Sequence, residues 1–200
     1  MKQLLPGIWQ WTWFSQEKQL DFNGLFLVLG EHRVLVDPPP LTEEARTVIH
    51  RQGPVDSLVI TNRDHLREAA ACRSEFGCRL FFPDPDAAAM EIVPDATYRD
   101  GELLPGGMLA VGLKGQKSPG ESALFLQRER GVLIVGDALI GKPAGSVSML
   151  SPDKYADVAK AKEGLRRLLD YEFDSLLVGD GVSILTGAKS IVHHVLERVS

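Results

Sequence analysis

Short runs of Val, Ile, Leu and Phe recur along the chain, and each is bounded by Gly, Pro or Asp. Runs of this length and composition predict buried β-strands. Three tryptophans near the N-terminus, Trp9, Trp11 and Trp13, alternate with other residues, as on a half-buried strand with one shared face. The other predicted strands are Leu25–Gly30, Arg33–Asp37, Ser57–Thr61, Arg79–Pro83, Met108–Leu113, Ser122–Gln127, Gly131–Asp137 and Asp174–Asp180.

Helical patterns separate several of these strands. The predicted helices are Thr42–Arg51, Leu66–Phe76, Pro152–Asp170 and Ala188–Val199. In the third of them the apolar residues follow a 3.6-residue period, so one face is expected to pack on a sheet. Charged turns link the early strands as in hairpins, whereas helices separate later strands. The sheets should therefore be mixed rather than purely parallel.

A weak internal repeat indicates how the elements are organised. "DSLVITN", from Asp56 to Asn62, has the apolar pattern of "DSLLVGD", from Asp174 to Asp180. "EHRVLVDPP" similarly matches "ERGVLIVGD", and the two strands end at Asp37 and Asp137. Two halves built from the same units would stack their sheets face to face with helices outside. We expect a single domain over residues 1–200.

Composition narrows the classes of function. The formal charge of −5 and the scattered Lys and Arg residues provide no basic surface for nucleic acid. No apolar stretch is long enough to cross a bilayer, and Pro6-Gly7 interrupts the N-terminus before a secretory segment forms. We expect a cytoplasmic protein whose partner is a small-molecule substrate or ligand, with no nucleic-acid or membrane partner.

Polar side chains follow four of the predicted strands. Asp37, the cluster Asn62, Asp64 and His65, and then Asp137 and Asp180 occupy these positions. A single Asp after a strand is typical of a turn or a helix cap. Four strand ends with the same chemistry favour a shared site, because ligands of α/β folds collect at the carboxyl ends of strands. Clustered carboxylates repel one another unless a cation lies among them, and a metal ion is the simplest such cation.

The order of these segments resembles that of the metallo-β-lactamase-fold hydrolases. "NGLFLVLGEHRVLVD" is similar to the opening hairpin of the family, "DSLVITN" to the strand before its metal-binding loop, and "GQKSPGESALFL" to a later loop and strand with a metal-binding His. "GVLIVGDALIG" resembles the strand whose Asp bridges two metals, here Asp137, and "LLVGDG" resembles the strand that ends in Gly-His-Gly. The resemblance covers nearly the whole chain. It implies an α+β fold, a four-layer αββα sandwich of two mixed β-sheets with outer helices.

The chain departs from the family's His-x-His-x-Asp-His motif, for which it has "NRDHLR". In one register, Asn62 and Asp64 replace the two histidines, and Leu66 and Arg67 replace the Asp-His pair. In the other register, Asp64 and His65 are the Asp-His pair, and Ile60 and Asn62 replace the histidines. Both registers remain open. Gln116 or Lys117 stands at the next histidine of the family, and Asp180 stands at the last.

The resulting ligand set is rich in oxygen. The candidate metal ligands are Asn62, Asp64, His65, Asp137 and Asp180. Zinc favours imidazole and thiolate, so an ordinary dizinc site is not expected. The set suits one divalent ion, Mg²⁺ or Mn²⁺ rather than Zn²⁺. In the alternative, the site holds no metal, and Lys117 or Arg63 neutralises the carboxylates as part of a salt-bridged network.

Two hypotheses of function follow. In the first, the protein is a hydrolase of small esters, thioesters or lactones, with Asp64 as a catalytic residue and metal ligand. Lys117 would stabilise the oxyanion, and His65 would move a proton. In the second, the protein is a non-catalytic, metal-free descendant that binds a small ligand or serves as an oligomeric scaffold, with the tryptophans as a homodimer surface.

Overall fold

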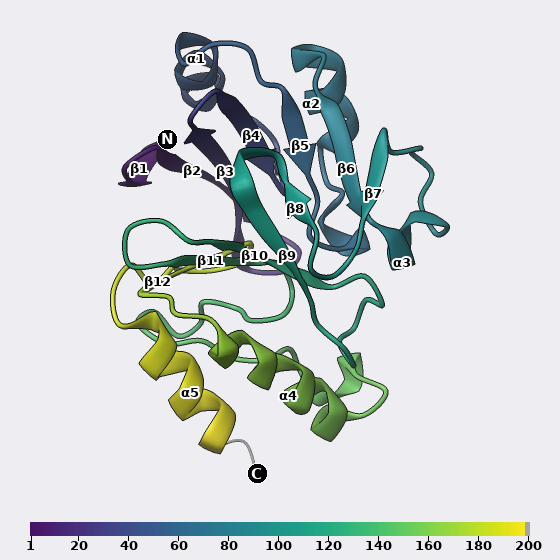
Figure 1. The fold of residues 1–200 in the computed structure, drawn as a ribbon, viewed down its shortest axis with the longest axis vertical. Coiled ribbons are helices and arrows are strands. Elements are labelled where there is room, and N and C mark those ends of the chain that lie inside the picture. The colour runs from purple at the N-terminus through teal and green to yellow at the C-terminus, as the bar shows by residue number, and fades with distance from the viewer. Residues whose placement is uncertain (199–200) are drawn as a thin grey trace.

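The computed structural model describes residues 1–198 and has two β-sheets packed face to face between layers of helices (Figure 1). The sheets are mixed, and the αββα architecture predicted from the sequence is confirmed. The first sheet contains β1 (Lys2–Leu5), β2 (Ile8–Ser15), β3 (Leu20–Leu29), β4 (His32–Val36), β5 (Ser57–Val59), β6 (Arg79–Pro83) and β7 (Ala96–Tyr98), in that order. The second contains β12 (Ser175–Val178), β11 (Val132–Val135), β10 (Ser122–Leu126), β9 (Met108–Gly112) and β8 (Leu103–Leu104), in that order.

The helices cover the outer faces of the two sheets. Helices α1 (Glu43–Arg51) and α2 (Ala69–Phe76) lie on the first sheet, and α4 (Val158–Arg166) and α5 (Ala188–Arg198) lie on the second (Figure 1). A short helix, α3 (Asp84–Ala87), follows β6. Separate apolar clusters lie between the two sheets and beneath each helical layer. Burial of apolar area in these three layers is the main stabilising term of the fold.

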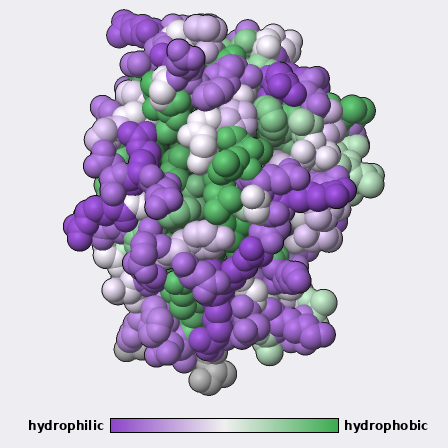
Figure 2. Space-filling model, viewed as in Figure 1, coloured by the Kyte–Doolittle hydropathy of each residue, from purple (hydrophilic) through white to green (hydrophobic). Residues whose placement is uncertain are grey.

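The surface seen in Figure 1 is mostly hydrophilic, with a hydrophobic patch near its centre, over β8 (Figure 2). Leu103 in β8 is 74% exposed, and β8 is the edge strand of the second sheet. Apolar side chains therefore reach the solvent at this edge.

The two halves of the chain repeat the same connection, as the internal repeat predicts. In each half an antiparallel hairpin, β3–β4 or β10–β11, leads through a helix to a strand parallel to the second strand of the hairpin. Thus β5 pairs with β4, and β12 pairs with β11. Since paired parallel strands end at the same edge of a sheet, each half delivers two strand ends to one rim of the sandwich.

Two predicted helices differ from the structure. The helix predicted from Leu66 begins at Ala69, because a 3₁₀ turn at Arg63–His65 comes first and Arg67 has a left-handed φ of +37°. The helix predicted over Pro152–Asp170 consists of 3₁₀ turns at Pro152–Lys154 and Arg167–Asp170 flanking α4. The chain is extended at Tyr155, and Asp157 caps α4 by accepting a hydrogen bond from the Lys160 amide.

The strands and helices are otherwise placed close to the predicted ranges. The tryptophan-containing strand is β2, with Trp11 buried and its indole donating to the Pro39 carbonyl. β1, α3, β7 and β8 were not predicted, because each is too short for a periodic signal. Val199, the predicted end of the last helix, lies outside the described residues.

Asn23 in β3 joins the two sheets at the rim where β4, β5, β11 and β12 end. Its backbone amide donates to the carbonyl of Gly179, and its Nδ2 donates to the carbonyls of Val178 and Gly181, at 3.0 and 2.7 Å. Its Oδ1 accepts hydrogen bonds from Gln10 and Thr12. Every polar group of this buried side chain is paired, so the loop after β12 is held against the first sheet.

Replacing Asn23 is expected to weaken this junction. In Asn23→Ala, two buried carbonyls lose their donor, at a cost of about 3 kcal/mol in the free energy of unfolding measured in urea. Gln16→Ala, at an exposed position in the neighbouring turn, is the control and should change stability by less than about 0.5 kcal/mol. Equal stabilities of the two variants would contradict this role.

Candidate functional site

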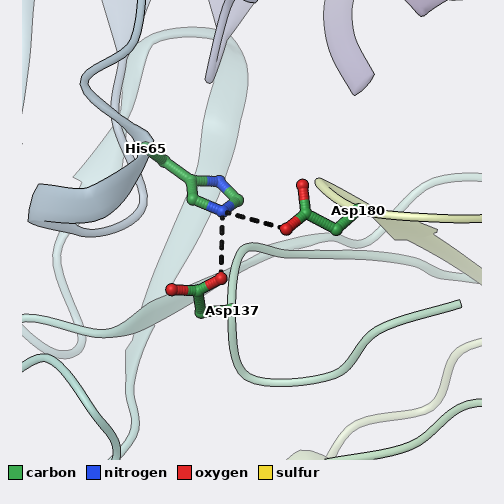
Figure 3. Close-up of side chains that lie close together, drawn as sticks. All are labelled: His65, Asp137 and Asp180. Carbon is green, nitrogen blue, oxygen red and sulfur yellow. Dashed lines mark ion pairs between the residues drawn. The ribbon is translucent and has the colours of Figure 1, made fainter. Parts of the chain in front are cut away.

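Four strand ends meet at the rim between the two sheets. Asp37 follows β4, Thr61 to His65 follow β5, Asp137 follows β11 and Asp180 follows β12. Figure 3 shows His65, Asp137 and Asp180 pointing toward one another. The three residues lie in different segments, which follow β5, β11 and β12. The site is therefore assembled from both halves of the chain.

The turn after β5 directs His65 inward. Asn62 caps this turn, since its Oδ1 accepts hydrogen bonds from the backbone amides of Asp64 and His65, at 2.9 and 3.2 Å. His65 is 2% exposed and packs against Gly179. A Cβ at position 179 would lie 2.4 Å from Cε1 of the imidazole, so glycine leaves the space that the ring occupies.

Asp37 fixes the orientation of the imidazole. Nδ1 of His65 lies 2.8 Å from Oδ2 of Asp37, and the same carboxylate accepts hydrogen bonds from the amide and hydroxyl of Thr61. With Nδ1–H donating to Asp37, the second ring nitrogen, Nε2, points to the other side. A carboxylate on the far side of an imidazole is the usual support of a metal-binding histidine.

Nε2 of His65 faces two carboxylates. It lies 3.4 Å from Oδ1 of Asp137 and 4.0 Å from Oδ2 of Asp180 (Figure 3). One nitrogen and two oxygen atoms of these residues lie within 4.8 Å of one another. Each of the three residues is buried. Because the three atoms converge on one point, they could ligate a single cation.

Two cationic side chains hold the other carboxylate oxygens. Nζ of Lys117 lies 3.0 Å from Oδ2 of Asp64 and 3.1 Å from Oδ2 of Asp137. The guanidinium of Arg67 binds Oδ1 of Asp180, lies 3.2 Å from Nε2 of His65, and stacks on the ring of Phe22, 4.4 Å from its centroid. The cluster therefore contains two built-in ion pairs that bridge the two halves of the chain.

When no metal ion is present, the surrounding charges favour a protonated imidazole in His65. Burial and the Arg67 guanidinium lower the pKa of His65, but Asp37 and Asp137 outweigh them and raise it to about 10. Burial raises the pKa of Asp137, yet His65 and Lys117 prevail and hold it well below its ordinary value. For Asp180 burial prevails, so its pKa is raised despite His65 and Arg67.

Glu121 is a member of the cluster that the sequence analysis missed. It is 1% exposed, its Oε1 accepts a hydrogen bond from the amide of Ala138 at 3.1 Å, and its Oε2 has no hydrogen-bond partner among the described residues. Burial and the charge of Asp137 raise its pKa well above the ordinary value. The available signal was an acidic residue between Pro119-Gly120 and the mainly apolar strand that begins at Ser122.

The other predicted site residues lie at the edge of the cluster. Asn62 serves the turn through Oδ1, and Asp64, 37% exposed, faces Lys117 rather than His65. The side chain of Gln116 donates to the carbonyl of Ala161, near α4. Arg63 is exposed, and the arginine that enters the site is Arg67.

The charges of the cluster fit one divalent ion. With Asp37, Asp64, Asp137 and Asp180 ionised, the cations of Lys117 and Arg67 leave two negative charges. One divalent ion beside a neutral His65 balances these charges, whereas a second ion would leave two positive charges in a largely buried site. The residues present therefore fit a mononuclear site and do not fit a dinuclear one.

No helix in the described part of the chain is both long and apolar enough to span a membrane.

Comparison with known proteins gives one family and many similar structures. A family model described as "Metallo-beta-lactamase superfamily" matches residues 1–198. No curated protein matches the chain. The crystal structure of the metallo-beta-lactamase DIM-1 has 15% sequence identity and a TM-score of 0.80, over 100% of this chain and 97% of that one.

Two further structures show the same fold. A metallo-beta-lactamase from Pontibacter korlensis has 18% identity and a TM-score of 0.76, over 98% of this chain and 96% of its own. A metallo-beta-lactamase family protein from Thermus thermophilus has 19% identity and a TM-score of 0.70, over 98% of this chain and 79% of its own. At these identities the likeness shows the fold alone.

The protonation of His65 predicts a pH-dependent stability in protein kept free of divalent ions. A proton bound more tightly in the folded state stabilises it fully below the ordinary pKa of 6.5, and this stabilisation is lost as pH rises toward about 10. Urea unfolding at pH 6, 8 and 9.5 should show a decline of at most about 1.4 kcal/mol per pH unit, reduced in His65→Gln. The same slope in both proteins would contradict this assignment.

Removal of Arg67 is expected to destabilise the fold. The side chains of Arg67 and Asp180 are 8% and 9% exposed, so Arg67→Met leaves a buried carboxylate without its partner. The expected cost is about 3–5 kcal/mol in the free energy of unfolding at neutral pH. Arg63→Met, in the same turn but exposed, is the control and should cost less than about 0.5 kcal/mol. Similar losses in both variants would show that the ion pair with Asp180 is not responsible.

Proposed function

Because the chain belongs to the metallo-beta-lactamase superfamily, we propose that it is a hydrolase with a single divalent ion in its active site. Membership of this superfamily supports a metal-dependent, hydrolase-like function. The proposed substrates are small esters, thioesters or lactones, whose carbonyl carbon is attacked by water. The proposed ligands of the ion are His65, Asp137 and Asp180.

The observation that carries this proposal is the convergence of three ligand atoms on one point. Nε2 of His65, Oδ1 of Asp137 and Oδ2 of Asp180 face one another, and the remaining polar atoms of these side chains are already bound. One imidazole and two carboxylates form a mainly oxygen donor set, which suits Mn²⁺ or Mg²⁺ better than a thiolate or multi-histidine set would.

A divalent ion at this point would supply Lewis acidity, which lowers the pKa of water and polarises a carbonyl group. The protein orients the three ligands. Asp37 holds the imidazole with Nε2 facing Asp137 and Asp180, and Lys117 binds the outer oxygen of Asp137. Arg67 binds the outer oxygen of Asp180 and lies 3.2 Å from Nε2. These contacts fix each ligand before substrate binds, which reduces the reorganisation needed during the reaction.

Lys117 and Asp64 are suited to act on the substrate. Their side chains are 32% and 37% exposed, whereas the carboxylates of Asp137 and Asp180 are about 9% exposed. The Lys117 ammonium can stabilise negative charge on a carbonyl oxygen. Since Nε2 of His65 would hold the ion, the Asp64 carboxylate rather than His65 is the group left to accept a proton from the attacking water and pass it to the leaving group.

A second candidate function is a metal-free protein that binds a small ligand without turnover. It is favoured by the three ion pairs that Lys117 and Arg67 form with Asp64, Asp137 and Asp180, which together with a protonated His65 neutralise most of the carboxylates. In that state the cluster is a structural network that stabilises the rim. The tryptophan-containing strand β2 remains a proposed homodimer surface.

Metal binding tests the first function directly. After dialysis against chelator, Mn²⁺ at 100 times its dissociation constant should stabilise the protein by about 2.7 kcal/mol, which raises the melting temperature by about 5–10 °C. Hydrolysis of 4-nitrophenyl acetate, an acyl thioester and a γ-lactone should require the same ion. Asp137→Asn should abolish both effects, whereas Asp153→Asn, at an exposed position, should change neither.

The outcomes separate the two functions. A melting temperature that does not change with Mn²⁺, Mg²⁺ or Zn²⁺, together with no turnover of the three substrates, would rule out the hydrolase and favour the metal-free protein.

A further inference from the structure

The ammonium group of Lys117 lies between two carboxylates. Its ammonium lies 3.0 and 3.1 Å from one oxygen each of Asp64 and Asp137, which come from the two different halves of the chain. The other oxygen of Asp137 faces His65. Asp137 thus lies between the candidate metal position, lined by His65 and Asp180, and the ammonium group of Lys117.

A carboxyl group held at the backbone next to Asp137 has an unused oxygen. Glu121 binds the amide of Ala138, the residue after Asp137, through Oε1, and its buried Oε2 has no hydrogen-bond partner among the described residues. Buried polar atoms without partners are uncommon and call for an explanation. Asp64 and Asp137 place carboxylate oxygens against the ammonium group, and Glu121 is held at the backbone next to Asp137.

We propose that Lys117 is a built-in counter-ion that restricts the site to one divalent ion by filling a second cation position with its ammonium group. This inference rests on the proposed function, because it concerns the number of ions that the site accepts. In this role Lys117 determines how many metal ions bind per chain, in addition to any contact that it makes with substrate.

Charge explains why one side chain has this effect. With Lys117 present, two divalent ions would leave two positive charges in the cluster, and a second ion would also lie near a fixed ammonium group. Replacing Lys117 by an uncharged residue removes this repulsion and frees the oxygens of Asp64 and Asp137. Arg67 has the corresponding place on Asp180, but it is more buried and stacks on Phe22, so its removal would disturb the fold.

The experiment measures the number of Mn²⁺ ions bound per chain. Wild-type protein and Lys117→Gln are dialysed against chelator and then against excess Mn²⁺, and bound metal is determined by elemental analysis and by calorimetric titration. We expect about one ion per chain in the wild type and about two in Lys117→Gln. Lys117 is at the rim, so the variant should fold, and its far-ultraviolet circular dichroism and unfolding transition verify this.

Three further variants make the result specific. Lys117→Arg keeps the positive charge and should bind the wild-type number of ions. The double variant Lys117→Gln with Asp64→Asn loses one of the freed ligands and should return to the wild-type number. Lys142→Gln, at an exposed position in the loop after Asp137, is the matched control and should not alter the stoichiometry.

The outcomes distinguish this inference from the proposed function. If the wild type binds no ion and Lys117→Gln binds one, the metal-dependent function fails, but the role of Lys117 as counter-ion stands. If Lys117→Gln binds the same number of ions as the wild type, the inference is overturned whatever that number is. A gain of one ion by Lys142→Gln as well would also overturn it.

Discussion

The structure of the rim between the two sheets depends on one constraint: the negative charge of its buried carboxylates must be compensated by nearby positive charge. Four aspartates end strands or begin loops within one small region, and three of them are almost completely buried. Such a cluster is stable only if positive charge lies among the carboxylates. Lys117, Arg67 and His65 supply it, and each of them contacts an aspartate from a different part of the chain. The ion pairs therefore connect the two halves as well as setting the chemistry of the site.

The architecture explains why these groups meet. Each half has a hairpin, a helix and a parallel strand, so each sheet ends in two adjacent strand ends at the same rim. Asn23 then ties the loop after β12 to the first sheet, and this contact fixes Asp180 near His65. Regular backbone pairing brings the strand ends together, and the short turns that follow them carry the side chains of the site.

The layered fold could be predicted because apolar runs indicate strands, a weak internal repeat indicates two similar halves, and the order of the segments resembles that of the metallo-β-lactamase-fold hydrolases. The acidic strand ends could be predicted for the same reason, since each follows directly on an apolar run. The partners of those acids could not. Arg67 was expected within a regular helix, but its left-handed backbone turns the side chain toward Asp180, which is 113 residues away. Glu121 directly precedes a strand, but this position alone does not predict a buried carboxyl group, because its burial depends on tertiary packing. Sequence shows which chemistry is present, whereas charge pairing across long separations decides where each group points.

The absence of a side chain at Gly179 limits which substitutions the chain can accept during evolution. His65 occupies the volume that any larger residue at position 179 would need, although the two positions belong to opposite halves of the molecule. A larger residue at position 179 would therefore be tolerated only if the imidazole moved or a smaller residue replaced His65. This contact ties the choice of residue in one repeated half to the choice in the other.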